Sequence, residues 1–381
     1  MKRLVNVFLR GAADGLNILA PVGDPAYHAN RPTLALPEGA ALDVGIDGFG
    51  LHPRAPRLAE LVRGRAAALV PAAGYHGQTR SHFQSQAILE NAVESDGSPS
   101  KGGSVGRLGA QLAKGAAEVV RSFRGVAVGS TTVPPSLWGT GDALGAPQLS
   151  ALRLGALAPR RGRDGYEVHD SPSAPDRPAL SSQWAERDAA PEVSRIGAGA
   201  AVEVLGRLTG SPLDPGDTSA FGTGEAAEVF AAASALLDSD LGTEVVQIDL
   251  GGWDTHQAQG SVDGTLAELL AGLDAGLGAL VERHVGRGDG LVVTVMTEFG
   301  RRVRENASGG TDHGTGGLAV VVGDGVAGGL RGRWPGLEEL ADGDVVAAND
   351  LRVLQAEVAA AVFGTGADLP AAVQPLDLFA R

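Results

Sequence analysis

Side chains that can bind a divalent metal ion occur in four short motifs that lie far apart in this sequence. The motifs are GAADGLN, GGWDTH, TEFGR and GTDHG, and their candidate ligands are Asp14, Asp254, His256, Glu298, Asp312 and His313. Carboxylate and imidazole are common ligands for divalent metals. Three of the motifs follow apolar runs typical of buried parallel strands, and GTDHG precedes such a run. Because the carboxyl ends of parallel strands meet at one edge of a sheet, the pattern predicts a metal site there.

The motif GGWDTH offers a pair of ligands. Asp254 and His256 are two residues apart, so in an extended segment both side chains point the same way and can reach one ion. The two glycines before them allow a close approach of the backbone. The alternative is that Asp254 caps the next helix and His256 lies on the surface. An Asp-x-His pair is an uncommon choice for a turn, which favours the metal site.

The other motifs are weaker signals when each is taken alone. Asp312 and His313 lie in the loop SGGTDHGTGG, which can curl around an ion but can also be a flexible surface loop. Asp14 follows the first apolar run, where Asp-Gly also makes an ordinary turn. Glu298 follows LVVTVM with Arg301 close behind, and arginine matches the geometry of phosphate or sulfate. A surface ion pair between Glu298 and Arg301 is the alternative.

Ser81 begins a helical pattern as SHFQ, where Ser followed three residues later by Gln is a capping box. The same position also suits a nucleophile, because a helix N-terminus favours the anion that the nucleophile attacks. Both roles stay open, and further hydroxyls lie nearby at Thr79, Thr297 and Thr311. The remaining histidines considered have no carboxylate at ligand spacing and are expected to be structural or exposed: His28, His52, His76, His169 and His284.

Apolar runs alternate with helical patterns along most of the chain. Strands are expected at residues 4–9, 66–72, 126–129, 244–250, 291–296 and 318–322. Helices are expected at residues 57–63, 81–94, 105–117 and 266–281, and after Asn349, which can cap the last one. The alternation predicts a single α/β domain over residues 1–381, with a mostly parallel central sheet sandwiched by helices. Residues 138–240 are expected to hold an insertion or a helical cap.

Composition excludes several classes of protein. The 381 residues are 43% apolar and carry a net charge of −14 without a block of Lys or Arg, which argues against a sequence-independent grip on nucleic acid or anionic lipid. Cysteine is absent, so there is no disulfide, thiolate ligand or cysteine nucleophile. No run approaches the roughly 20 apolar residues of a membrane span. The glycine-rich segment GDGVAGG at residues 323–329 follows a strand without completing a dinucleotide fingerprint.

The motifs together resemble a large bacterial family known as domain of unknown function 1501. The likeness rests on FLRGAADGLN, PVGDPAYHANRPTLAL, RSHFQSQ, DLGGWDTH, TEFGRRVREN, SGGTDHG and GVAGGLRGRWPGL, and runs from the first strand to the last helix. That family is grouped with the alkaline phosphatase and sulfatase superfamily. The resemblance implies an alkaline phosphatase-like central sheet flanked by helices, with one or two metals at its edge. Family members often carry a twin-arginine export leader, which this sequence lacks.

The resemblance also implies roles for individual residues. Asp14 matches the first metal ligand of the superfamily, and Ser81 matches the position of its nucleophile. Asp254 and His256 match a middle pair of ligands, and His313 matches the final histidine. On this interpretation Asp254, His256 and His313 hold one ion.

One departure from the superfamily pattern concerns the second ion. Glu298 lies where an Asp-His pair is expected, and Phe299 takes the place of that histidine. The second metal site therefore lacks an imidazole, which argues against two-metal catalysis. Asp14 and Glu298 then hold a second ion or shape the first, and Arg80 or Arg301 holds the anionic group of the substrate.

The sequence therefore predicts a hydrolase of phosphate or sulfate esters that depends on a divalent metal ion, either Zn, Mn, Mg or Ca. Its substrate is a small molecule or an ester borne on a polymer. The alternative is a non-catalytic metal-binding or structural protein that retains the fold, as the missing imidazole suggests. A phosphomutase, which would need a phosphorylated serine, is a third hypothesis. As written the chain is expected to be soluble and cytoplasmic, and exported if a twin-arginine leader has been removed.

Overall fold

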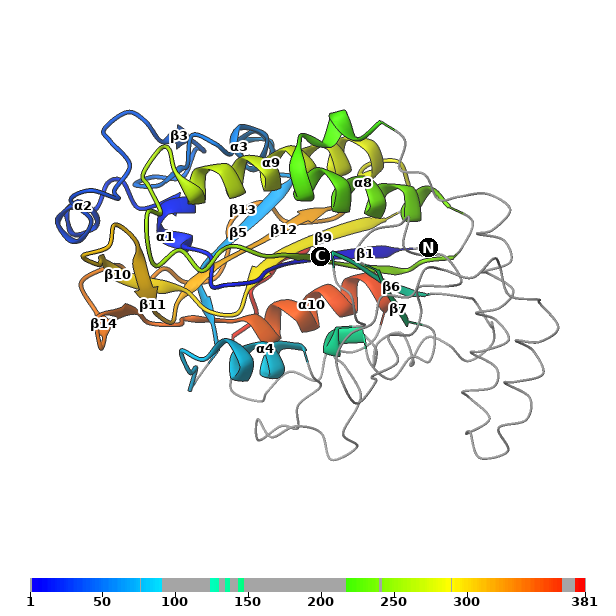
Figure 1. Ribbon diagram of the computed structural model, residues 1–381. Helices are drawn as coiled ribbons and strands as arrows, with labels where there is room; N and C mark the ends of the chain where they lie inside the picture. Colours follow the sequence, from blue (N-terminus) through cyan, green and yellow to red (C-terminus); the bar gives the residue numbers. More distant parts are fainter. Residues whose placement is uncertain are drawn as a thin grey trace, which may run out of the picture.

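A central sheet with helices on both faces organises the protein (Figure 1). The computed structural model describes residues 2–75, 77–90, 124–129, 134–137, 143–146, 217–239, 242–288, 290–364 and 374–380. The helix expected at residues 105–117 and most of the insertion or cap expected at 138–240 lie outside the described residues. The arrangement of sheet and helices confirms the predicted α/β class in this coarse form.

The central sheet is mixed. Its described strands follow the order β13-β5-β12-β9-β1-β8-β6-β7, and β16 also pairs with β5. The bounds are β1 Arg3–Leu9, β5 Ala67–Gly74, β6 Gly125–Val128, β7 Ala143–Ala146, β8 Val245–Leu250, β9 Leu291–Thr297, β12 Gly317–Gly323, β13 Gly329–Leu330 and β16 Asn349–Asp350. All six strands expected from the apolar runs are present, with ends shifted by at most two residues. β1 is parallel to β8 and β9, whereas β12 is antiparallel to both β9 and β5.

The direction of the strands decides where their ends lie. Because β12 is antiparallel to both of its neighbours, β5 runs in the same direction as β9 and β1. The carboxyl ends of β1, β5, β8 and β9 therefore meet at one edge of the sheet, which is where ligands bind in open α/β sheets. This edge carries the motifs that were singled out in the sequence.

Helices cover both faces of the sheet (Figure 1). One face is covered by α3 Pro56–Arg63, α8 Gly224–Asp238 and α9 Thr265–His284, and the other by α4 His82–Glu90 and α10 Leu351–Phe363. In β1, Val5 and Val7 belong to the apolar core on the side of α3, α8 and α9. Leu4 and Phe8 belong to the apolar core on the side of α4 and α10. Burial on both faces explains why this strand is an almost continuous apolar run in the sequence.

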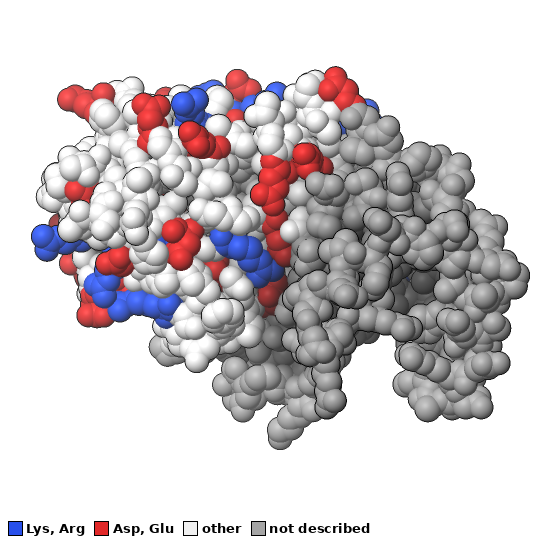
Figure 2. Space-filling model, in the orientation of Figure 1, with Lys and Arg blue, Asp and Glu red and all other residues white. Residues whose placement is uncertain are grey.

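Smaller elements surround the sheet. They are α1 Gly15–Ile18, β2 Leu19–Ala20, α2 Pro25–Asn30, β3 Leu42–Asp43, β4 Gly50–Leu51, η1 Pro135–Leu137, η3 Thr218–Phe221, β10 Arg301–Glu305, β11 Thr311–His313, β14 Leu340–Ala341 and β15 Asp344–Val345. Within the described residues, no helix is both long and apolar enough to cross a membrane. On the face seen in Figure 2, acidic and basic side chains of the described residues are interspersed.

The start of α10 corrects one prediction. Asp350, not Asn349, caps this helix, and its carboxylate accepts a hydrogen bond from the Arg352 amide. Asn349 is buried in β16 instead, where its amide donates to the carbonyl oxygens of Pro71 and Arg333. Both residues can cap a helix. The sequence alone does not show that Asn349 pairs with β5 and that the helix therefore begins one residue later.

Candidate metal centre

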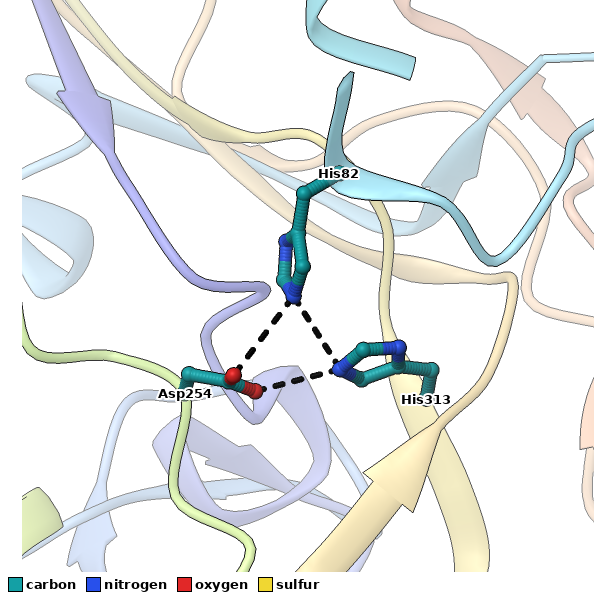
Figure 3. A group of neighbouring side chains, drawn as sticks. All are labelled: His82, Asp254 and His313. Carbon is teal, nitrogen blue, oxygen red and sulfur yellow. Dashed lines mark hydrogen bonds and ion pairs between the residues drawn. The ribbon is translucent and has the colours of Figure 1, made fainter. Parts of the chain in front are cut away.

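Three side chains from distant parts of the chain point toward one another at the carboxyl edge of the sheet (Figure 3). His82 begins α4 after β5, Asp254 follows β8, and His313 ends β11. One ligand atom from each lies within 4.8 Å of those from the other two. We call these three residues the triad.

The spacing within the triad suits one small cation. The Nε2 atoms of His82 and His313 are 3.1 Å apart, and Nε2 of His313 is 3.1 Å from Oδ1 of Asp254. Nε2 of His82 is 3.6 Å from Oδ2 of Asp254. Around a tetrahedral zinc-sized ion, ligand atoms are separated by about 3.3 Å when each bond is about 2.0 Å long. Two of the three distances within the triad are slightly shorter than that separation, and the third is slightly longer.

His256 adds a fourth donor to the triad. Its Nε2 atom lies 2.9 Å from Nε2 of His313 and 3.1 Å from Oδ1 of Asp254. The pairing of Asp254 with His256 that the sequence predicts is therefore present. The side chains of Asp254 and His256 are 47% and 37% exposed, so the cluster is open to solvent on this side.

Each imidazole is held through its other ring nitrogen. Nδ1 of His82 is 2.8 Å from Oε1 of Glu298, Nδ1 of His256 is 3.1 Å from Oδ1 of Asp312, and Nδ1 of His313 is 3.0 Å from the carbonyl oxygen of Arg80. These acceptors place the ring proton on Nδ1 and leave the Nε2 lone pairs facing the cluster. Lone pairs this close repel one another unless a cation or a proton lies between them, so the arrangement favours a bound cation.

Local electrostatics keep the ligands in the state that a metal requires. Burial lowers the pKa of His313 more than the nearby Asp254 carboxylate raises it, so this imidazole is neutral near pH 7. Burial raises the pKa of Asp254, but the hydrogen bond from Arg301 and the nearby imidazole of His313 outweigh it and hold the pKa below its ordinary value. A neutral imidazole and an ionised carboxylate are the forms that bind metal.

Glu298 is buried and acts on the cluster through His82. Its carboxylate accepts hydrogen bonds from the amides of Gly11 and Ala12 at 3.0 and 3.1 Å and from Gln86 at 2.8 Å. Burial raises the pKa of Glu298. The hydrogen bonds to its carboxylate, including the one from His82, lower the pKa by a larger amount, so the group stays ionised. The sequence predicts Glu298 as a metal ligand, whereas in the structure its carboxylate bonds to the candidate ligand His82.

Asp14, also predicted as a ligand, lies outside the triad. Its buried carboxylate forms two hydrogen bonds with the guanidinium of Arg31, at 2.5 and 3.1 Å, and accepts a third from Gln259 at 2.6 Å. Arg31 is itself fully buried and also donates to the carbonyl oxygens of Arg302 and Val303. The charge of Asp14 is thus balanced by an arginine from the loop after α2.

The two arginines predicted to bind the substrate anion are engaged within the protein. Arg301 is buried and donates to Asp254 Oδ1 at 2.6 Å and to the carbonyl oxygens of Gly11, Ala12, Trp253 and Thr311. It therefore ties together the loops that follow β1 and β8 and the start of β11. Arg80 donates to Asp342 and Asp344 at 2.7–2.9 Å.

Ser81 directly precedes the triad residue His82. Its carbonyl oxygen accepts the Ser85 amide at 2.9 Å in the first turn of α4. Among the described residues its hydroxyl has no hydrogen-bond partner, so the geometry does not choose between cap and nucleophile. Both roles remain predictions.

His82 is the functional candidate that the sequence pattern missed. It lies in RSHFQSQ, where attention falls on the neighbouring Ser81 and its capping box. A usable signal was present, because RSHFQSQ follows a buried strand just as GGWDTH does. His82 also supplies an imidazole beside Glu298, where the sequence pattern shows only Phe299. The Phe299 ring packs against the imidazoles of His82 and His313, with centroids 4.9 and 5.0 Å away.

Comparison with known proteins gives limited matches. No curated protein matches the chain. Among solved structures, the chain is similar to phosphonoacetate hydrolase from Sinorhizobium meliloti 1021, in complex with phosphonoformate, at 14% sequence identity and a TM-score of 0.31. The likeness covers 79% of this chain and 57% of that enzyme. A TM-score this low does not establish a shared fold. The profile of a family described as "Protein of unknown function (DUF1501)" matches residues 215–356, which include Asp254, His256, Glu298 and His313 but not His82.

Proposed function

We propose that this protein is a hydrolase of phosphate or sulfate esters that uses one divalent metal ion, held by His82, Asp254 and His313 with His256 as a further donor. The convergence of three imidazole Nε2 atoms and one carboxylate at a solvent-open sheet edge carries this proposal. In open α/β sheets this edge is where substrates bind.

The donor set narrows the choice of ion. Imidazole nitrogen suits zinc and other first-row transition metals, whereas magnesium and calcium prefer sites made of oxygen ligands. Of the ions predicted from the sequence, zinc and manganese fit three imidazoles and one carboxylate better than magnesium or calcium. Such an ion supplies Lewis acidity at the ester and lowers the pKa of a coordinated hydroxyl.

The residues around the ion have distinct tasks in this proposal. Glu298 and Asp312 hold His82 and His256 in the orientation for binding. Arg301 holds the Asp254 carboxylate in place. Ser81, beside His82, is the candidate nucleophile. The substrate would be a small molecule or an ester on a polymer, entering from the exposed side of Asp254.

A non-catalytic metal-binding protein is the second candidate. Its support is that both carboxylates proposed for a second ion are engaged, Asp14 by Arg31 and Gln259, and Glu298 by His82, Gln86 and backbone amides. Arg80 and Arg301 also bond within the protein. A binding protein needs neither a second ion nor an arginine that contacts the substrate.

Metal content and ester hydrolysis test the two candidates together. Purified protein is analysed for bound metal and assayed on a panel of chromogenic phosphate and sulfate esters with added Zn, Mn, Mg or Ca. The hydrolase should carry about one ion per chain and hydrolyse an ester, and Asp254→Ala should lose both properties. Asp263→Ala removes a carboxylate that is 85% exposed and is the matched control. Bound metal without turnover on any ester would favour the binding protein, and absence of metal affinity would refute both.

Ser81→Ala tests the covalent mechanism separately. If Ser81 is the nucleophile, the variant should keep its metal and lose turnover. Unchanged turnover would remove Ser81 from the chemistry while leaving the metal centre in place. If Ser81 also caps α4, the alanine variant should lose about 1 kcal/mol in stability, whether or not turnover changes.

A further inference from the structure

A cleft lies at the opposite edge of the central sheet from the triad. It has a volume of about 460 Å³, and its lining includes Arg63, Arg65 and Arg331 together with Gly328 and Gly329 at the start of β13. Gly329 and Leu330 of β13 pair with Ala68 and Leu69, near the start of β5, whereas His82 follows the end of β5. At about 3.3 Å per residue, the length of β5 places the two sites roughly 15–20 Å apart.

The cleft is basic in a chain that is acidic overall. Three arginines line it with one carboxylate, that of Asp43, whose Oδ1 atom accepts the Gly45 amide at 2.8 Å. Elsewhere Arg10, Arg80 and Arg352 form ion pairs, but within the described residues none of the three cleft arginines pairs with a carboxylate. In a protein of net charge −14, several guanidinium groups in one cleft without carboxylate partners are unusual, and they favour a bound anion there.

Two of these arginines are fixed by backbone carbonyls. Arg331 donates from Nε to the carbonyl oxygen of Ala327 at 2.6 Å and from Nη2 to that of Gly328 at 3.2 Å. Arg63 donates from Nη1 to the carbonyl oxygen of Asp43 at 2.9 Å. Bonds to neutral carbonyls orient a guanidinium without cancelling its charge, which leaves the group ready for an anion.

Arg65 occupies a backbone position that favours glycine. Its φ is 57°, in the left-handed region, directly after the end of α3. The bonds from Arg65 N to Val62 O and from Ala66 N to Leu61 O are those of a Schellman motif, in which this position is usually glycine. An arginine here is strained, and strain of this kind concentrates at functional sites.

The glycines of the segment GDGVAGG, which the metal centre does not use, bring β13 close to Arg65. A Cβ on Gly328 would lie 2.3 Å from the Arg65 carbonyl oxygen, so only glycine permits this approach. A Cβ on Gly329 would lie 3.9 Å from Arg65 Nη1, so the guanidinium lies alongside that glycine. The two glycines thus allow Arg65, an exposed residue, to lie alongside the start of β13 in the cleft.

We propose that this cleft is a binding site for a small molecule that bears a phosphate or sulfate group. Guanidinium donors match the paired oxygens of a tetrahedral anion, and the volume accommodates a molecule with more than one such group. The site is separate from the triad, and its existence does not depend on the proposed hydrolase.

Calorimetric titration of the full chain with pyrophosphate tests this site. The protein is first treated with a chelator so that no metal at the triad can bind the anion. Saturable binding with one site per chain is expected. Arg65→Gly and Arg63→Gln should each weaken it by about tenfold or more, the loss that accompanies removal of a charge-assisted hydrogen bond. Arg287→Gln removes an exposed arginine three residues after α9 and should leave binding unchanged.

The Arg65→Gly variant also separates binding from stability. Glycine relieves the left-handed strain, so this variant is expected to melt at a higher temperature than the parent while binding more weakly. Competition by sulfate is expected, because the proposed chemistry is that of a tetrahedral anion. The proposal is overturned if wild-type protein shows no saturable binding, if binding requires metal, if citrate binds more tightly than pyrophosphate, or if both arginine variants bind like the parent.

Discussion

At the scale of single residues, the proposed metal centre depends on side chains that would not touch the ion. Glu298, Asp312 and the carbonyl oxygen of Arg80 each accept a hydrogen bond from one imidazole and so fix which ring nitrogen faces the cluster. Among these acceptors, Glu298 is expected to contribute most to the orientation of an imidazole, because it is buried and also accepts hydrogen bonds from backbone amides in the loop after β1. Its position links the orientation of His82 to the backbone of a neighbouring strand.

Glu298→Gln is expected to weaken metal binding by about 10–100-fold, the usual effect of changing such a partner. The amide keeps the shape of the carboxylate but removes its charge, and its NH₂ group opposes one of the donors that now bond to Glu298. Competition with a chromogenic chelator measures the affinity. Glu339→Gln, a change of the same kind at an exposed position, is the control. An affinity equal to that of the parent would show that Glu298 does not orient His82.

At the scale of elements, close backbone approaches hold the ligand-bearing loops together. Gly310, just before β11, lies against the loop that carries Asp254 and His256: a Cβ on Gly310 would lie 2.3 Å from the carbonyl carbon of His256 and 2.4 Å from the carbonyl oxygen of Thr255. The amide of Thr311 donates to that Thr255 oxygen at 3.2 Å. The positions of His256 and His313 therefore depend on this contact between loop and strand.

Gly310→Ala should separate β11 from the loop after β8 and weaken metal binding, at a cost of about 1–3 kcal/mol in stability. Gly251→Ala is a matched control in the same loop, since a Cβ there meets nothing within 4 Å. The control should change stability by no more than about 0.5 kcal/mol and should keep its metal. Chelator competition and urea unfolding measure the two effects. Equal metal affinity in both variants would contradict the proposed dependence on the contact.

The elements also show how far a sequence can take the prediction. The strands were predictable because burial on both faces makes each of them a nearly continuous apolar run, as Leu4 to Leu9 shows. Asp254, His256 and His313 were predictable because they follow or precede such runs. His82 also follows a buried strand, but its sequence does not show that its partners Glu298 and His313, which come from other parts of the sheet, lie beside it.

The engagement of Asp14 was hidden for a similar reason. Its partner Arg31 lies beyond α1 and α2, at the start of an irregular segment without a periodic signal. The antiparallel direction of β12 was equally hidden, because an apolar run buried on both faces reads the same in either direction. Sequence patterns indicated which segments lie at the sheet edge, and strand directions and long-range contacts decided which atoms meet there.

At the scale of the whole molecule, buried histidines make stability depend on pH. His52 is fully buried, with Nε2 2.7 Å from the Ser261 carbonyl oxygen and Nδ1 accepting the Arg54 amide at 3.1 Å. This pattern requires a neutral ring, and a proton on Nδ1 would oppose the Arg54 N–H. Burial lowers the pKa of His52 and of His284, the last residue of α9, whose ring bonds to Ser234 of α8.

The pH dependence has a definite sign. Each lowered pKa means that the unfolded chain binds more protons than the folded chain as pH falls below the ordinary histidine pKa of about 6.5. The free energy of unfolding should therefore fall as pH decreases from about 6.5, until the folded-state pKa is reached. Urea unfolding at pH 7.5 and 5.5, in the presence of a chelator, measures the change. His52→Gln should reduce this difference, whereas His28→Gln, which removes an exposed histidine, should not. A difference of the same size in His52→Gln would exclude His52 as a source.

The distribution of the triad along the chain sets the order in which the protein can be assembled. His82 is synthesised long before Asp254 and His313, and the three meet only after β5, β8, β9 and β12 have joined the sheet. A local metal motif can capture its ion while the rest of the chain is still unfolded, but these residues offer no shared site until the strands are paired. An ion at the proposed site would therefore bind last, to chains that have already folded.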